Sequence, residues 1–596
     1  MTIAIAKLRQ LANAARFDEF LAACMQQMES AWDDAPTLLD IGSLLLAFGY
    51  LTLARRCFEQ AGMLLPDDPG PAINLANVAM EAGEHEAVRA LYARLTTRWP
   101  NQATLHRNAL NSQAYDPTSD TATYLAAART WGLRALGRSG GVLPRPPLRA
   151  LNGRPLRVGY VSADFCGHTV GYLIRPVLAT HDPQRVCAFA YAQIKQDDGI
   201  TDAIRAVTQF RDITALDPKA LARQIEDDRI DVLVDLSGHT AGSRLLSFVY
   251  RPAPVMVSWL GYYATTGLSL LDAVLLDEWH APPGTEEQFV EPILRLPTGR
   301  FCYAPPEFMP RAAPPSSVKH GHVRFGCFNN TAKLTDAVFD LWAEILRQVP
   351  DSRLILKWRT LQDAALRDKI LAAFVRRGIA AARIELRGAS FHRALLEEYG
   401  EIDIALDPFP FTGGMTSCEA LFMGVPVVTW PQARVVSRQT WAFLNQIGHP
   451  ELAAQDAADY VRIAVTLAGD THRRIRLRRT LRQQMLASPL CDVAGFTRSL
   501  EAALVGLYER IAHNVALEKE KTMPKIKIDN REYDTDSLSD VARQNLQMLQ
   551  MTEQEIQRLQ MQLAIAQTAR NAFANALKQN LPATAEQAMG ETMKFG

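Results

Sequence analysis

The sequence predicts an α/β protein with an all-helical N-terminal solenoid, two successive Rossmann-like halves with parallel sheets, and a small C-terminal module of a hairpin and a helix. Three observations support this prediction: a 34-residue repeat in the first 100 residues, strand-length apolar runs from Leu156, and a second series of such runs from Val323. The chain has 596 residues, more than one hydrophobic core ordinarily holds. Its 48% hydrophobic and 21% charged residues exclude a mainly disordered or fibrous chain.

Charge and cysteine content narrow the function classes. The 64 Lys and Arg residues balance the 64 Asp and Glu residues, whereas nucleic-acid-binding proteins usually carry a basic excess, so we expect no nucleic-acid partner. The eight cysteines show no CxxC pair and no His/Cys ligand spacing, which predicts reduced thiols rather than disulfides or a zinc site. No signal peptide is evident, and no run approaches the roughly 18 apolar residues of a membrane span. We therefore expect a cytoplasmic protein without a membrane span.

Residues 1–136 are predicted to form the helical solenoid. Pro66 and Pro100 are 34 residues apart, as are Gly49 and Gly83. The positions at which a tetratricopeptide unit needs particular large or small residues are filled by Leu38, Gly42, Leu45, Ala54, Phe58 and Ala61. A generic pair of helical hairpins is the alternative. Two such units cannot bury a stable face alone, so flanking helices should complete a solenoid, a structure that usually binds polypeptides.

The Gly- and Pro-rich residues 137–155 are predicted to be a linker. After it, residues 156–318 and 319–516 each alternate apolar runs with helical stretches, which indicates two parallel α/β layers. The clearest strand candidates are Leu156–Ala163, Cys187–Ala192, Ile230–Leu236, Val323–Phe328, Ser352–Lys357, Ile402–Leu406 and Val425–Trp430. Neither half has a GxGxxG run after its first strand, which disfavours a dinucleotide-dependent redox enzyme.

The tail is predicted to be a separate module. A charged linker, residues 517–522 (LEKEKT), is expected after a helix that ends near Ala516. Within residues 523–596, the alternation over Lys525–Tyr533 predicts a small hairpin. Apolar residues at three- and four-residue steps from Leu549 predict an amphipathic helix.

The strongest local signal for chemistry is the segment Leu406–Pro426, LDPFPFTGGMTSCEALFMGVP. A strand ends, a loop rich in Pro and Gly follows, and a helix begins near Gly414, so the first-turn amides of that helix suit a phosphate. Glu419 lies one turn further on and is well placed to accept from a ribose diol. Additional hydroxyl donors are Thr412, Thr416 and Ser417. An ordinary strand–loop–helix crossover is the alternative.

Four motifs together resemble the bacterial members of the O-GlcNAc transferase family. They are Ser162–Tyr172 (SADFCGHTVGY), Trp259–Gly267 (WLGYYATTG), Cys327–Thr335 (CFNNTAKLT) and Leu406–Pro426. The resemblance covers about residues 35–510 in the same order. It implies tetratricopeptide repeats joined to a GT-B glycosyltransferase of two Rossmann-like domains. The tail beyond Thr522 lies outside this pattern.

The resemblance implies roles for residues around the sugar donor. Lys333 matches a lysine that contacts the donor diphosphate, and Asn330 matches a donor-contacting glutamine of the same loop. Thr416 matches a threonine at the pyrophosphate, Glu419 matches an aspartate that holds the ribose, and Gly261 lies in a loop where a missing side chain lets the sugar approach. A lysine charge at that point would stabilise departing UDP; a solvated surface lysine is the alternative.

Two histidines are candidates for the general base. His168 matches a histidine that faces the sugar and the acceptor, and the ordinary pKa of histidine suits proton transfer; the alternative is a loop histidine that only shapes the cleft. His239 follows the third strand of the first half, again at the cleft side. Asp164 and Asp235 are further candidates for proton transfer, unless they only cap loops.

Some positions depart from the family pattern. Gly414 and Met415 stand where the diphosphate loop usually has a histidine and a threonine, so backbone amides should do more of the anion binding. Leu395 stands where a nucleobase-stacking histidine is expected, with His392 three residues earlier. Glycosyltransferases of this type stabilise the leaving group with protein cations and amides, and we expect neither a metal nor another cofactor.

The resemblance implies an inverting protein O-glycosyltransferase that moves a sugar, with GlcNAc expected, from a UDP donor to Ser or Thr of a polypeptide. The alternatives are glucose or another hexose as the sugar, asparagine as the acceptor, or a repeat scaffold with a degenerate transferase fold. The tail has no place in the pattern, so it is interpreted as a fused acceptor, an adaptor or an oligomerising helix. Its candidate acceptor residues are Thr535, Ser537 and Ser539.

Overall fold

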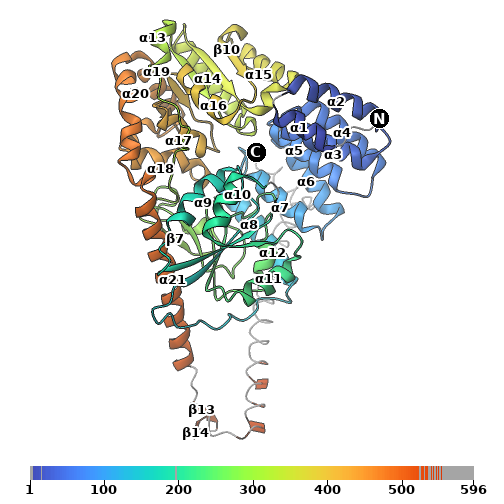
Figure 1. The fold of residues 1–596 in the computed structure, drawn as a ribbon, viewed down its shortest axis with the longest axis vertical. Coiled ribbons are helices and arrows are strands. Elements are labelled where there is room, and N and C mark those ends of the chain that lie inside the picture. The colour runs from blue at the N-terminus through green and yellow to red at the C-terminus, as the bar shows by residue number, and fades with distance from the viewer. Residues whose placement is uncertain are drawn as a thin grey trace, which may run out of the picture. The chain divides into compact units, whose positions relative to one another are not determined.

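The computed structural model describes residues 5–14, 16–194, 197–521, 525–528 and 531–534, together with isolated positions from Ser539 to Thr552. Met1–Glu509 form one compact unit and Arg510–Gly596 a second. In the first unit, a helical region is followed by two parallel α/β halves (Figure 1).

In the described part of the chain, eight helices precede the first sheet, and four of them follow the predicted repeat. Their bounds are α1 Ile5–Asn13, α2 Phe17–Ser30, α3 Ala35–Ala47, α4 Leu51–Leu64, α5 Gly70–Glu81, α6 His85–Arg98, α7 Ala103–Gln113 and α8 Thr121–Gly137. Gly42 of α3 faces the ring of Phe58 on α4, and a Cβ at Gly42 would lie 2.6 Å from that ring. Close packing therefore requires the small residue at this helix crossing, as the repeat pattern predicts.

The first α/β half contains a seven-stranded parallel sheet in the order β3-β2-β1-β4-β5-β6-β7. Its strands are β1 Leu156–Ser162, β2 Val186–Ala192, β3 Gln209–Asp212, β4 Val232–Asp235, β5 Val255–Ser258, β6 Ala273–Leu276 and β7 Ile293–Arg295. Its helices are α9 Thr169–Thr180, α10 Gly199–Val207, α11 Pro218–Asp227 and α12 Leu245–Phe248. At the centre, Val158 pairs with Ala188 and Val232 on the neighbouring strands. Both faces of such a sheet are covered, which explains its near-continuous apolar runs.

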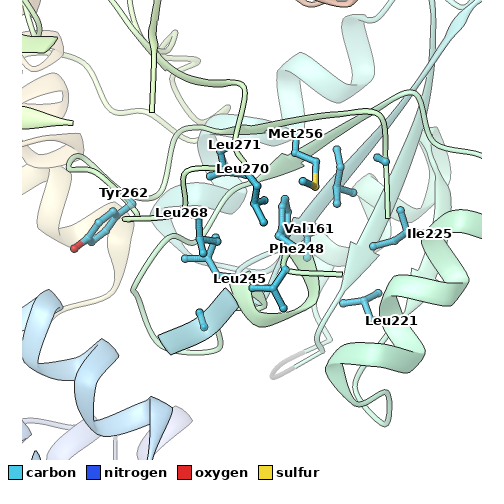
Figure 2. Packing of buried hydrophobic residues seen from close by; sticks show 14 of the residues in the cluster. Val161, Leu221, Ile225, Leu245, Phe248, Met256, Tyr262, Leu268, Leu270 and Leu271 are labelled. Carbon is cyan, nitrogen blue, oxygen red and sulfur yellow. The ribbon is translucent and has the colours of Figure 1, made fainter. Parts of the chain in front are cut away.

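The core of this half includes the last helix of the helical region. Val161 of β1, Met256 of β5 and Phe248 of α12 belong to one buried cluster (Figure 2), and Trp131 of α8 belongs to the same cluster. Gly132 of α8 also meets the backbone of Gly267, where a Cβ at Gly132 would lie 1.8 Å from the carbonyl oxygen. Helix α8 is therefore part of this core, and its glycine permits the close approach.

The second half contains a five-stranded parallel sheet in the order β10-β9-β8-β11-β12. Its strands are β8 Arg324–Cys327, β9 Arg353–Lys357, β10 Ile384–Arg387, β11 Ile404–Leu406 and β12 Val427–Val428. Its α-helices are α13 Ser316–His320, α14 Asp336–Gln348, α15 Ala364–Arg376, α16 His392–Glu398, α17 Met415–Phe422, α18 Gln439–Gln446, α19 Ala457–Gly469 and α20 Thr471–Leu486.

The helical region packs against this second half through polar contacts. Arg359 pairs with Glu81 at 2.7 Å, and its other terminal nitrogen donates to the carbonyl of Leu46 at 2.8 Å. The amide of Thr52 donates to Asp363 Oδ2 at 2.7 Å. The helices thus contact both α/β halves within one compact unit.

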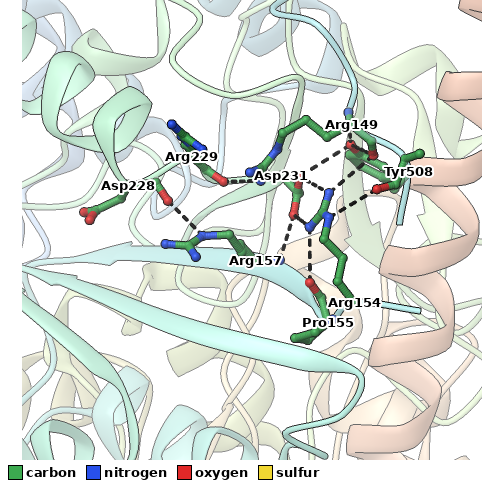
Figure 3. A network of polar contacts seen from close by, with 9 residues as sticks. Arg149, Arg154, Pro155, Arg157, Asp228, Arg229, Asp231 and Tyr508 are labelled. Carbon is green, nitrogen blue, oxygen red and sulfur yellow. Dashed lines mark hydrogen bonds and ion pairs between the residues drawn. The ribbon is translucent and has the colours of Figure 1, made fainter. Parts of the chain in front are cut away.

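Helix α21, Val493–Lys521, returns from the second half to the first. Phe496 stacks on Trp259 with ring centroids 6.0 Å apart. Further along, Tyr508 donates to the carbonyl of Arg149 at 2.9 Å, next to the buried Asp231 (Figure 3). These contacts fix the helix to the first half.

Asp231 is the centre of this polar network (Figure 3). Its oxygens pair with Arg149 at 2.7 Å and Arg154 at 2.6 Å, and accept from the Arg157 amide at 2.9 Å. Burial acts to raise the pKa of Asp231, but the hydrogen bonds from Arg154, the Arg157 amide and Arg149 hold that pKa below its usual value. Asp231 is therefore ionised and structural.

The prediction of a linker at residues 517–522 needs correction, because α21 continues to Lys521. Leu, Glu and Lys favour a helix, and no helix breaker occurs before Pro524. In the second unit, β13 Lys525–Ile528 and β14 Arg531–Asp534 pair antiparallel, where the hairpin was expected.

Most of the remaining tail lies outside the described residues, including the candidate acceptors Thr535 and Ser537 and nearly all of the expected amphipathic helix. Ser539 is described and exposed. Among the described residues, no helix is both long enough and apolar enough to cross a membrane.

Candidate active site

The candidate site is built from two loops that follow neighbouring strands of the second half. Strands β8 and β11 pair in parallel, so the loops after their carboxyl ends lie at the same edge of the sheet. The loop after β8 contains the short 3-10 helix Thr331–Lys333. The loop after β11 leads into α17, whose N-cap is Gly414.

Lys333 is buried between these loops. Its ammonium donates to Asn329 Oδ1 at 3.0 Å and to the carbonyl of Thr412 at 2.9 Å. It also lies 4.3 Å from the ring centroid of Phe411, a favourable cation–π geometry. Burial lowers the pKa of Lys333 to about 8, opposed by the nearby carboxylate of Asp407. The amine is therefore held in place and is still mostly protonated at neutral pH.

The start of α17 provides donors beside Lys333. The Thr416 hydroxyl donates to Asn329 Oδ1 at 3.1 Å, the same oxygen that Lys333 contacts. Gly414 supplies no side-chain cap to the helix, so the first-turn amides remain directed at the loop, as the sequence predicts for an anion site. A Cβ at Gly414 would lie 3.1 Å from Gln439 Oε1, which leaves little room for a larger residue.

Asn329 joins Lys333 to Thr416, whereas Asn330, the residue predicted to contact the donor, takes no part in this link. Asn330 caps the short 3-10 helix by accepting from the Ala332 amide at 3.0 Å, and its side chain also hydrogen-bonds to Glu81. The sequence offers two adjacent asparagines after a strand, and only the backbone path decides which one turns toward α17.

Glu419 lies one turn into α17 and pairs with His392. Its Oε1 is 2.7 Å from His392 Nε2. The ring centroid of His392 lies 5.8 Å from that of Tyr172 on α9 and 5.4 Å from that of Phe308. His392, three residues before Leu395, therefore supplies an imidazole to this part of the site.

These side chains line a cavity of about 200 Å³ between the two α/β halves. Tyr172 comes from the first half, whereas His392, Met415 and Glu419 come from the second half. Its lining residues are Tyr172, Arg175, Ile200, Tyr303, Ala304, Pro306, Glu307, Phe308, His392, Met415 and Glu419. A carboxylate with aromatic rings around it suits a nucleoside, in which a diol and a flat base lie side by side.

His168 is the N-cap of α9. Its Nδ1 accepts from the Val170 amide at 3.2 Å and lies 3.9 Å from Asp164 Oδ2. The side chain is 50% exposed. His168 thus shapes the helix start and also remains accessible to a second reactant.

His239 lies in the core, in contrast to the predicted place at an open cleft. It is fully buried, and its ring packs edge-on against Trp131 at 4.5 Å and Tyr262 at 5.3 Å between centroids. Its Nε2 is 2.9 Å from the carbonyl of Thr266. Burial lowers the pKa of His239 to about 3. This environment suits a structural histidine.

Gly261 also has a packing role where a sugar contact was predicted. A Cβ at this position would lie 1.9 Å from the carbonyl oxygen of Leu236. The missing side chain therefore lets the loop after β5 meet the loop after β4. Asp235, at the end of β4, is fully buried, and burial raises its pKa to about 6.

Among the described residues, no group of three or more His, Cys, Asp or Glu side chains is arranged to hold a metal ion. All eight cysteines are free thiols. Around Lys333 lie the Asn329 amide oxygen, the Asp407 carboxylate, the Thr416 hydroxyl and the first-turn amides of α17; the amine, the hydroxyl and the helix amides can donate to an anion.

Two parallel Rossmann-like halves with a shared cavity at their strand ends define the architecture of a GT-B glycosyltransferase. Residues 145–308 and 317–500, more than half of the chain, match the model of glycosyl transferase family 41. The chain belongs to this family, which confirms the predicted fold class and the resemblance to O-GlcNAc transferases.

Individual relatives agree with this assignment. The chain is 35% identical over 419 residues to a barley protein named probable UDP-N-acetylglucosamine–peptide N-acetylglucosaminyltransferase SPINDLY, covering 69% of this chain and 44% of that protein. It is 28% identical to the corresponding SEC protein of Arabidopsis thaliana, covering 58% of this chain and 36% of that protein. The chain thus spans less than half the length of these curated relatives.

A solved structure of the O-GlcNAc transferase of Thermobaculum terrenum, a lysine-to-methionine mutant, is similar over most of the chain. The TM-score is 0.78 at 31% identity, and the match covers 86% of this chain and all of that one. The helical region and both α/β halves therefore form an arrangement that this solved transferase shares.

Proposed function

We propose that this chain is an inverting protein O-glycosyltransferase that moves GlcNAc from UDP-GlcNAc to a Ser or Thr hydroxyl of a polypeptide. One observation carries the proposal: Lys333 and Thr416, from loops after two neighbouring strands, both donate to Asn329 at the uncapped start of α17. An amine and helix amides at one point suit the diphosphate of a departing nucleotide. The names of the similar proteins from barley, Arabidopsis and Thermobaculum support the sugar and the peptide acceptor.

In the proposed reaction, the acceptor oxygen attacks the anomeric carbon from the face opposite UDP. The new carbon–oxygen bond forms while the bond to the diphosphate oxygen breaks, and the hydroxyl proton passes to a base. Lys333 and the α17 amides stabilise the negative charge that develops on UDP. His168, half-exposed at the start of α9, is the candidate base.

The cavity beside α17 would hold the nucleoside. Glu419, already oriented by His392, would accept hydrogen bonds from the ribose hydroxyl groups. Tyr172, Phe308 and His392 offer ring faces for the base. Because the leaving group is stabilised by an amine and amides, we expect transfer to continue at an unchanged rate in EDTA.

Intact-mass analysis tests the function. The chain is incubated with synthetic Ser, Thr and Asn peptides and either UDP-GlcNAc or UDP-glucose, and the peptides and the chain are weighed by mass spectrometry. The proposal expects a HexNAc on Ser or Thr peptides. A hexose instead would assign UDP-glucose as the donor, and modified Asn peptides would assign N-glycosylation.

A second candidate function, a scaffold with a degenerate transferase site, is favoured by Met415, which lines the cavity without a hydroxyl. Calorimetry with UDP separates the two functions. A transferase should bind UDP and release it from the sugar donor, whereas a degenerate scaffold should show neither.

A further inference from the structure

The cavity beside α17, which we call the donor cavity, contains two polar groups that nothing in the described chain satisfies. The Nε of Arg175 and the hydroxyl of Tyr303 are both buried, and neither has a hydrogen-bond partner among the described residues. Both residues line the cavity, together with Tyr172, His392 and Glu419. Buried polar groups are nearly always paired in proteins. A ligand with hydrogen-bond acceptors would therefore complete this cavity.

Arg175 brings an unpaired positive charge to the donor cavity. It lies on α9 and is half-buried. Within the part of the chain that the structure describes, its side chain forms no ion pair and no hydrogen bond. A guanidinium stays charged at physiological pH and presents N–H donors but no acceptor. Its partner in the cavity must therefore be an acceptor.

The position of Arg175 along α9 places it near the nucleobase rather than the reacting sugar. His168, the candidate general base, is the N-cap of α9, and Arg175 lies about two helical turns, or about 10 Å, further along the axis. Tyr172 lies between them, with its ring centroid 5.8 Å from that of His392. Residues three apart share one face of a helix. Since the sugar and the nucleobase are at opposite ends of a nucleotide sugar, the rings of Tyr172 and His392 would meet the face of the nucleobase and Arg175 its edge.

The edge of a nucleobase decides whether a guanidinium can bind it. Uracil presents the O4 carbonyl, an acceptor, at the position where cytosine presents an amino group, a donor. The guanidinium of Arg175 would donate to O4, whereas the amino group of cytosine would leave it unpaired. A site built to form a hydrogen bond strongly rejects an analogue that cannot form it, because the buried polar group then stays unpaired.

Tyr303 lies near Glu419, on the ribose side of the donor cavity. Burial and the charge of Glu419 raise the pKa of Tyr303 well above its usual value, so the phenol keeps its proton and can donate. Its hydroxyl would complete the ribose, which uridine and cytidine nucleotides share. A comparison of these two nucleotides therefore isolates the edge that faces Arg175.

We propose that Arg175 selects the sugar donor by its nucleobase, admitting a base with a carbonyl at this edge, such as uracil, and rejecting cytosine, which has the same shape but an amino group there. This inference rests on the proposed glycosyltransferase function. It gives α9 of the first half a share in donor recognition, in addition to the donor contacts assigned to the second half. Arg175 determines specificity and takes no part in the transfer step.

Calorimetry of the full chain with UDP and with CDP tests the proposal, because the two nucleotides have the same diphosphate and ribose. Wild type should bind UDP at least roughly tenfold more tightly than CDP, which corresponds to about 1.4 kcal/mol. Arg175→Met keeps an unbranched apolar side chain but removes the donors. It should weaken UDP binding and bring the two affinities within roughly threefold of each other. Arg175→Glu replaces donors by acceptors and should favour CDP.

Arg223→Met is the matched control. Arg223 is exposed on α11 of the same half and does not line the donor cavity. This variant should keep the preference of wild type for UDP. Thermal unfolding of all variants shows whether they are folded, and the wild-type comparison of UDP with CDP requires no variant.

Equal affinity of wild type for UDP and CDP would overturn the inference. An equal loss of both affinities in Arg175→Met would also overturn it, because the guanidinium would then bind the shared diphosphate or ribose. Failure of the proposed function looks different. Wild type would prefer UDP and lose this preference in Arg175→Met, yet transfer no sugar from UDP-GlcNAc to any peptide.

Discussion

The two Rossmann-like halves have the same parallel topology but differ in what covers the carboxyl ends of their strands. In the first half, helix α8 packs over the loop after β4 and buries His239 against Trp131. In the second half, the loops after β8 and β11 bring Lys333 and Thr416 to a shared asparagine. Polar groups are buried at the strand ends of both halves, but only in the second half do loops after two neighbouring strands gather donors at the start of a helix.

The largest expected effect is that of Lys333→Ala. Losing one preorganised charge at the leaving group costs about 3 kcal/mol of barrier, a few hundredfold in turnover. The measurement is UDP release with UDP-GlcNAc, together with thermal unfolding. Lys219→Ala, an exposed lysine on α11, is the control and should leave turnover unchanged. Near wild-type turnover of Lys333→Ala would mean that the diphosphate site is misplaced.

The two histidines should respond in opposite ways. His168→Ala should lower turnover by about a hundredfold through loss of the base, with a stability loss of about 1 kcal/mol from the missing helix cap. His239→Ala should lower stability by about 2 kcal/mol and leave turnover of the folded protein within a few fold. Rates and chemical denaturation of both variants check this; a large rate loss in His239→Ala at full stability would restore His239 as a catalytic candidate.

We expect Phe411 to influence the pH at which kcat/KM falls on the alkaline side. Its ring contacts Tyr115 and Tyr263, with centroids 4.6 and 4.7 Å away, and lies under the Lys333 ammonium. Since burial lowers the pKa of Lys333 to about 8, wild-type kcat/KM should fall as pH rises through about 8 and the charge is lost. Phe411→Ala admits water and should move this limb to higher pH, while lowering kcat/KM at neutral pH about tenfold.

Phe411→Leu keeps the site dry and serves as the comparison. Its alkaline limb should stay near that of wild type, although the cation–π contact is gone. An alkaline limb that is the same in all three proteins would show that Lys333 does not control it.

Much of the fold follows from the sequence because local patterns dictate it. Short apolar runs predict the parallel strands, and the Gly- and Pro-rich loop ending near Gly414 predicts the start of α17. The 34-residue spacing predicts the crossing at which Gly42 meets Phe58. Each of these signals depends on neighbours along the chain or on a fixed helical period.

The rest depends on contacts between distant segments. His239 is buried because Trp131 of α8 lies over it, and no pattern around residue 239 reports that helix. Likewise, the Leu236 carbonyl occupies the space where a side chain at residue 261 would lie, and Asn329 rather than Asn330 points toward α17. Helix α8 was assigned to a separate domain, yet its apolar face completes the core of the first half, which the repeat spacing cannot reveal.

The smallest expected effect on turnover is that of Asp231→Asn, which tests whether the polar network of the first half is purely structural. Asp231 is buried and held by Arg149 and Arg154, and its pKa in the folded protein is lowered. A lowered pKa contributes stability above the unfolded value of about 4 and loses it as pH falls through the folded value. At pH 7 the free energy of unfolding of the variant should be about 2 kcal/mol lower than that of wild type, with unchanged turnover. This difference in stability should shrink below about pH 4.

Denaturation across pH checks this, with the exposed Asp227→Asn on α11 as the control. A difference that persists undiminished in acid would mean that shape rather than charge holds α21 in place.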